Sequence, residues 1–141
     1  MRIFDCFMFY DEEVLLELRL NMLNRYVDFF IIVESKFYHN GNPRELRFDI
    51  NKYEKFKDKI IYLTHNEVPK NLQKIYPEDE EGNKSWKLIE NALMRENDQR
   101  NYISQGLTAA KDDDFILISD VDEIPNLHSC NLKQVDNEII I

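Results

Sequence analysis

This chain of 141 residues is poor in the residues that build linkers, repeats and membrane spans. It has only three glycines and four prolines, and no Gly-rich tract, Ser-rich tract or internal repeat divides it. No uninterrupted apolar stretch approaches the ~20 residues that a transmembrane helix needs. We therefore predict one compact domain over residues 1–141, with no membrane segment in it.

Cysteine and positive charge are also scarce. Cys6 and Cys130 form no CxxC pair, so they predict neither a tetrahedral zinc site nor a disulfide framework. The 18 Lys and Arg residues face 27 Asp and Glu, and the formal net charge of −9 argues against nucleic acid as a partner. The N-terminus enters an apolar run at once, without the pattern of a signal peptide. The cysteines and the N-terminus together predict a cytoplasmic protein. Because the chain is acidic overall, a phosphate-bearing ligand would need a local cation.

What the chain does contain is a regular alternation of strand-like and helix-like segments. Near-continuous apolar runs predict strands at 3–9, 29–33, 59–63 and 115–119, as in a parallel sheet that is buried on both faces. Helical patterns lie between them. The order predicts an α/β protein with three layers, α/β/α, and a mostly parallel sheet.

Helical spacing predicts which side of each helix meets the sheet. Asp11 is expected to cap a first helix that runs to about Tyr26, and its apolar stripe is Leu16, Leu20, Leu23 and Val27. Ser85 is expected to cap a long helix with six residues turned inward, namely Trp86, Ile89, Leu93, Tyr102, Ile103 and Leu107. A short helix at 51–56 and a long polar loop at 64–84 complete the prediction.

The most informative motif is the run Ser119-Asp-Val-Asp-Glu-Ile-Pro125, which follows the last apolar strand. Asp120 and Asp122 lie at i and i+2, so both carboxylates can converge at the carboxyl edge of the sheet, where open α/β sheets bind ligands. Their oxygens suit Mg²⁺ or Mn²⁺, and such an ion would neutralise a diphosphate. The alternative is an acidic turn without a function.

Several other polar residues lie where they could contribute to such a site. Glu34 ends the second strand on the ligand side. The long helix has a dense polar group in its middle turns, in which Glu96 and Arg100 are spaced to pair with each other. Asp5 interrupts an apolar strand, and we expect it to orient an arginine because a buried acid needs a partner. His39, His65 and His128 lie in predicted loops without metal-ligand spacing.

Four segments, in order, resemble the glycosyltransferase family of β-1,4-mannosyl-glycoprotein β-1,4-N-acetylglucosaminyltransferase, which adds the bisecting GlcNAc to N-glycans. They are Ile3–Glu13, Phe30–Ser35, Arg95–Asn101 and Ile116–Pro125. The resemblance covers the N-terminal portion of that family. It implies a GT-A fold, a nucleotide-sugar donor such as UDP-GlcNAc, a glycan acceptor, and inversion at the anomeric carbon.

The resemblance also implies roles for particular residues. Asp122 and Asp120 would hold Mn²⁺ or Mg²⁺, and Asp120 would in addition face the donor. The run Asp120-Val-Asp122 corresponds to the DxD motif of that family. Arg95 and Arg100 fall in the arginine-bearing segment that precedes the strand before this motif, and they are candidates for donor contacts together with Glu34. Five positions apart on a helix, the two arginines do not share a face. Glu123 would support the metal ligands from behind.

Members of this family extend well beyond the DxD strand, and their second half supplies the acceptor site and the catalytic base. This chain stops sixteen residues after Pro125, and Val135–Ile141 is typical of a strand. We therefore expect an incomplete transferase whose catalytic base is not among the recognised residues. The alternatives are a non-catalytic α/β nucleotide-sugar-binding or interaction module and, disfavoured because there is no Gly-rich phosphate loop, another metal-dependent phosphate-handling enzyme.

Overall fold

The structure is a computed structural model, and it describes residues 1–130 and residue 132. Its four strands are β1 (Ile3–Phe9), β2 (Phe29–Ser35), β3 (Ile60–His65) and β4 (Phe115–Ile118). Two α-helices, α1 (Glu13–Leu23) and α2 (Glu81–Asn101), and two 3-10 helices, η1 (Ile50–Phe56) and η2 (Tyr102–Gly106), connect them. The strand predicted at Val135–Ile141 lies outside the described residues.

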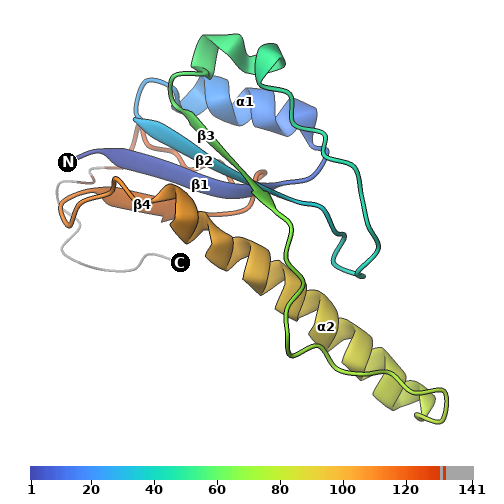
Figure 1. Ribbon diagram of the computed structural model, residues 1–141. Coiled ribbons are helices and arrows are strands. Elements are labelled where there is room, and N and C mark those ends of the chain that lie inside the picture. The colour runs from blue at the N-terminus through green and yellow to red at the C-terminus, as the bar shows by residue number, and fades with distance from the viewer. Residues whose placement is uncertain (131, 133–141) are drawn as a thin grey trace.

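The four strands form one sheet in the order β3-β2-β1-β4, and every neighbouring pair is parallel. Helices α1 and η1 cover one face, whereas η2 and the C-terminal end of α2 lie on the other (Figure 1). The prediction of a three-layer α/β fold is confirmed. Because all strands run the same way, their carboxyl ends meet at one edge of the sheet.

Alternating residues of the two central strands feed two separate cores. Phe7, Phe9, Phe30 and Ile32 pack toward α1, while Phe4, Cys6, Ile31 and Val33 pack on the opposite face with Ile103 of η2. Gly106 permits this second contact, because a Cβ there would lie 2.6 Å from Cγ2 of Ile31. The central strands are therefore buried on both sides, as their continuous apolar runs predicted.

The first helix buries the predicted stripe, but its start differs from the prediction. Leu16, Leu20, Leu23 and Val27 are all buried. Asp11 does not cap the helix: the residue at that position is Glu12, whose carboxylate instead accepts hydrogen bonds from the backbone N–H groups of Tyr10 and Asp11. Glu12 thus folds back onto the end of β1.

The predicted inward face of the long helix is confirmed at Tyr102, Ile103 and Leu107, which pack in the second core, but it is wrong for the other three residues. Helix α2 begins at Glu81, four residues before Ser85, and extends far beyond the sheet beside the segment 66–80 (Figure 1). Nothing covers the predicted face there among the described residues, so Trp86 is 52% exposed, Ile89 61% and Leu93 51%. The buried residues of this helix are the polar Asn91 and Gln99. In the described part of the chain, no helix combines the length and apolar character needed to cross a membrane.

Candidate functional site

A cavity of about 290 Å³ opens at the carboxyl edge of the sheet, where β1 and β4 end. Four carboxylates lie on its wall, which makes it strongly acidic. Its lining comprises Met8, Tyr10, Glu12, Leu15, His39, Glu96, Asp120, Val121 and Asp122. The structure therefore brings both predicted aspartates to one cavity, together with residues from the ends of β1, the loop after β2, and α2.

The turn after β4 holds the two aspartates by its own hydrogen bonds. The backbone N–H of Asp120 donates to the Glu123 carboxylate at 3.1 Å, and the N–H of Glu123 donates to the Asp120 carbonyl at 3.0 Å. Val121, between the aspartates, is buried in the core. The Glu123 carboxylate thus braces the backbone of the turn from outside the cavity lining, and its support of the metal ligands stays a prediction.

Arg19 of α1 anchors this turn from inside the protein. Its guanidinium is fully buried and pairs with Asp5, with Nε and Nη2 donating to the two carboxylate oxygens at 2.8 and 2.7 Å. The same side chain donates to Ser119 Oγ at 2.7 Å and to the carbonyl oxygen of Asp120 at 2.5 Å. Bidentate pairing of this kind fixes the arginine in one orientation. One buried side chain therefore ties β1, α1 and the aspartate turn together.

This anchor confirms that Asp5 orients an arginine, but the sequence did not identify which one. Arg19 is a cation on the buried face of α1, between Leu16 and Leu20. Its guanidinium also lies 4.5 Å from the ring centroid of Phe7. A charged residue on an apolar helical face, opposite an acid in an apolar strand, was the signal that could have found the pair.

Arg100 is the cation that reaches the aspartate turn. Its Nη2 lies 3.1 Å from Oδ1 of Asp120 and 3.0 Å from Oε1 of Glu96, so the predicted pairing of Glu96 with Arg100 is confirmed. The side chain of Asp120 remains 51% exposed. The Asp122 carboxylate forms no hydrogen bond with a described residue, so both aspartates present oxygen atoms to the cavity.

Arg95 points elsewhere, as expected for a helical residue five positions away. Its Nη1 donates to the carbonyl oxygen of His39 at 3.0 Å, and its guanidinium packs against Gly41. Gly41 has a φ of +92°, and a Cβ there would lie 2.7 Å from Nη2 of Arg95. The arginine lines a second, smaller cavity of about 40 Å³ and holds the loop after β2. Donor contact by Arg95 stays a prediction.

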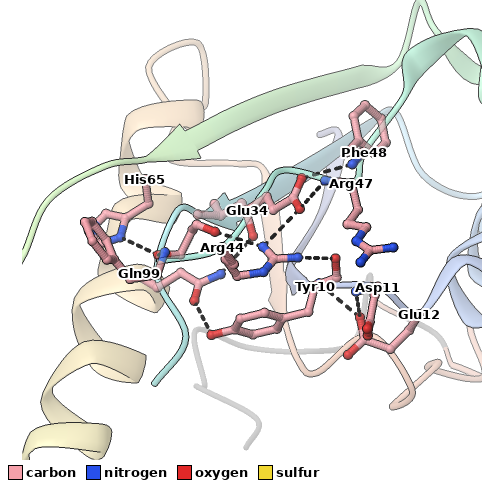
Figure 2. Close-up of polar contacts among 12 residues, drawn as sticks. Tyr10, Asp11, Glu12, Glu34, Arg44, Arg47, Phe48, His65 and Gln99 are labelled. Atoms are coloured by element: carbon pink, nitrogen blue, oxygen red, sulfur yellow. Dashed lines mark hydrogen bonds and ion pairs between the residues drawn. The ribbon is translucent and has the colours of Figure 1, made fainter. Parts of the chain in front are cut away.

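Glu34 is not brought to either cavity. Its carboxylate is completely buried and accepts hydrogen bonds from the backbone N–H groups of Arg47 and Phe48 (Figure 2). It also accepts a hydrogen bond from the Tyr62 hydroxyl. Nη1 of Arg44 lies 3.0 Å from the same carboxylate. Glu34 fixes the segment after β2, and its burial does not support a contact with the donor.

Arg44 links the ends of the two central strands, and no pattern in the sequence indicated this role. Its guanidinium donates to the carbonyl oxygens of Ser35 at 2.8 Å and Tyr10 at 2.6 Å. It also lies over the Tyr10 ring, 4.9 Å from the centroid. Because this cation pairs with Glu34 and is buried, it serves the framework beneath the site.

Tyr10 and Gln99 form a second polar contact between the sheet and α2 (Figure 2). Burial, assisted by Glu96 and Glu12, raises the pKa of the Tyr10 phenol and keeps it protonated.

His65, predicted in a loop, ends β3 and is buried, with Nε2 2.9 Å from Asp98. It therefore packs as a structural residue between β3 and α2.

The donor atoms at the cavity suit a hard divalent cation only in part. Among residues 1–130 and 132, no three His, Cys, Asp or Glu side chains gather closely enough to hold a metal ion by themselves. Mg²⁺, however, is usually held by one or two carboxylates with the remaining ligands from substrate phosphates and water. Asp120 and Asp122 fit that arrangement.

The chain has a parallel sheet and an acidic cavity at the carboxyl edge of that sheet. This is the edge at which open α/β proteins bind their ligands. The chain belongs to glycosyltransferase family 17, whose family model matches residues 1–140. It is therefore a glycosyltransferase, and its substrates are a sugar donor and an acceptor. Neither the curated proteins nor the solved structures gave a match.

Proposed function

We propose that this chain is the donor-binding part of a metal-dependent, inverting glycosyltransferase with a GT-A fold. Its donor is a nucleotide sugar, UDP-GlcNAc in the first instance, and its acceptor is a glycan. The observation that carries the proposal is the convergence of Asp120 and Asp122 at one cavity, with Arg100 3.1 Å from Asp120, on the edge of the sheet where parallel strands end.

Each of these residues has a role that follows from its surroundings. Asp122 is free to ligate Mn²⁺ or Mg²⁺, and Asp120 offers the oxygen that Arg100 does not use. When bound, the ion would neutralise the diphosphate leaving group as a Lewis acid. Arg100, which pairs with Asp120, would supply a positive charge near the same group. Glu123 keeps the turn in shape through the Asp120 backbone.

The charge of the cavity supports the metal dependence. Glu12, Glu96, Asp120 and Asp122 surround it, and Arg100 is already engaged by two of them. The negative charges of a diphosphate in this cavity would be repelled by these carboxylates, because charges a few ångströms apart interact strongly near a protein surface. A divalent cation changes the sign of that interaction. We therefore expect weak donor binding without Mn²⁺ and much tighter binding with it.

A non-catalytic module that binds the nucleotide sugar or a protein partner is the second candidate. The observation in its favour is the exposed apolar face of α2, formed by Trp86, Ile89 and Leu93. Exposed apolar residues in a group are typical of interaction surfaces. Sugar transfer or donor hydrolysis by the chain would decide against this candidate.

Calorimetric titration of UDP-GlcNAc, with and without Mn²⁺, tests the proposal. We expect metal-dependent binding that is lost in Asp122→Ala. Asp112→Ala is the matched control, because Asp112 is an exposed aspartate of the preceding turn that lines neither cavity. Circular dichroism confirms that both variants are folded. The absence of binding at millimolar donor, or equal binding by Asp122→Ala, would contradict the proposal.

A further inference from the structure

His39 lies between the two cavities and contributes to the lining of both. It belongs to the loop that follows β2, where Phe37 and Pro43 form an isolated bridge. Arg95 holds the loop from α2 by its hydrogen bond to the His39 carbonyl oxygen. The ring of His39 is therefore carried on a braced loop to the rim of the acidic cavity.

A chain of hydrogen bonds connects this ring to the backbone of β2. Nε2 of the buried Gln99 donates to the carbonyl oxygen of Val33 at 3.1 Å. This contact fixes the orientation of the amide, because a carbonyl oxygen accepts only from the N–H side. Oε1 of Gln99 therefore faces Tyr10, whose hydroxyl donates to it at 2.9 Å. The phenol has a single proton, and that proton is used here.

The remaining link of the chain determines the state of the imidazole. Nε2 of His39 contacts the Tyr10 hydroxyl oxygen. Since the Tyr10 proton points to Gln99, two lone pairs would face each other unless Nε2 of His39 carries a proton and donates it. In the neutral ring, Nδ1 is then the bare nitrogen. Within the described residues Nδ1 has no hydrogen-bond partner, so it is a free acceptor on a residue that lines both cavities.

We propose that His39 is a donor-binding residue whose Nδ1 accepts a hydrogen bond from an O–H or N–H group of the nucleotide sugar. The inference rests on the proposed function and deepens it. Ionised phosphates carry no proton to donate, so the partner of a bare nitrogen on this ligand belongs to the uridine or to the transferred sugar: the uracil N–H, a hydroxyl group, or the amide N–H of GlcNAc. The fixed tautomer removes the need to reorganise the ring when the donor binds.

The first test measures the tautomer in the full chain without a ligand. Long-range ¹H–¹⁵N NMR, at a pH at which histidine is neutral, should show His39 protonated at Nε2 and bare at Nδ1. The signals are assigned by their loss in His39→Gln. The preference should disappear in Tyr10→Phe, which removes the partner of Nε2. Protonation at Nδ1 in the unsubstituted chain would overturn the inference even if the donor binds.

The second test measures donor affinity in the presence of Mn²⁺. His39→Gln places an amide N–H near the Nε2 position but has no acceptor at Nδ1, so we expect about tenfold weaker binding, the equivalent of one hydrogen bond. His39→Asn keeps an amide oxygen near the Nδ1 position and should bind more tightly than His39→Gln. His128→Gln is the control, because His128 lines neither cavity.

Comparison of two ligands identifies the part of the donor that His39 contacts. A loss in His39→Gln that is equal for UDP and UDP-GlcNAc assigns the contact to the uridine, and a loss confined to UDP-GlcNAc assigns it to the transferred sugar. Affinity of His39→Gln equal to that of the unsubstituted chain, for both ligands, would overturn the inference. If the unsubstituted chain binds neither ligand, the proposed function fails, and the ligand role of His39 fails with it.

Discussion

Two pairs of carboxylates lie in the strands or at the strand ends of the same sheet, yet their surroundings are opposite. Asp5 and Glu34 are completely buried, and each is held by an arginine from another part of the chain. Asp120 and Asp122 are exposed at the cavity. The comparison teaches that position along a strand does not decide whether an acid serves the framework or the site. What decides it is whether a buried cation reaches the acid.

The difference has a physical cause in solvation. Burial of a carboxylate costs several kcal/mol of solvation free energy unless a cation and hydrogen-bond donors replace the water around it. Arg19 and Arg44 provide that replacement from α1 and from the loop after β2. The cavity carboxylates keep their water, so a cation that comes with a ligand can replace it.

Removal of the cation from the first buried pair should have the largest effect. Arg19→Met leaves Asp5 buried without its partner and also removes the anchor of the aspartate turn. We expect a loss of about 3–5 kcal/mol in the free energy of unfolding, measured by urea denaturation. The double variant Asp5→Leu/Arg19→Met should recover much of this loss. A loss below about 1 kcal/mol in the single variant would show that the pair does not hold the fold.

A matched pair of amide substitutions compares the two classes of carboxylate directly. Four donors surround the Glu34 carboxylate, so Glu34→Gln would place an amide N–H group against another donor. We expect a loss of about 2–3 kcal/mol in the free energy of unfolding. Asp120→Asn changes an exposed side chain and should alter stability by no more than about 0.5 kcal/mol. Its effect should instead be seen in metal-dependent donor binding. Equal losses of stability in the two variants would break the comparison.

Ser119 lies between the buried pair and the cavity, and its substitution should destabilise the protein less than a change in either buried pair. Its hydroxyl accepts from Arg19 and donates to the Glu123 carbonyl oxygen. Ser119→Ala leaves both groups without this partner, so we expect a loss of about 1 kcal/mol and a modest decrease in donor affinity. The exposed Ser129 provides the control substitution, Ser129→Ala. Stability unchanged in Ser119→Ala would mean that water replaces the hydroxyl.

The sheet and the aspartate turn could be predicted because their signals are local. Continuous apolar runs identified the strands, four-residue and three-residue spacing identified the buried stripe of α1, and strand-end placement located Asp120 and Asp122. The partner of Asp5 was predicted as a type of residue but not as a position, since Arg19 meets it only after the helix packs on the sheet.

The remaining features depend on contacts that no local pattern encodes. The spacing of Trp86, Ile89 and Leu93 describes one face of α2, but it does not tell whether the sheet reaches that far along the helix. Glu34 was expected at the ligand because it ends a strand, and Arg44 covers it from a loop. Long-range partners of this kind decide which polar residues are buried.

Arg19 also has a consequence for the order in which the protein folds. Its contacts to Ser119, Asp120 and Glu123 span 100, 101 and 104 positions of the chain. Closing so long a loop costs conformational entropy before any contact compensates for it. The aspartate turn therefore gains its contacts with Arg19 only when β1, α1 and β4 have assembled, and an isolated peptide of residues 115–125 would keep only the hydrogen bonds within the turn. The position of Asp120 and Asp122 thus depends on contacts between distant parts of the chain.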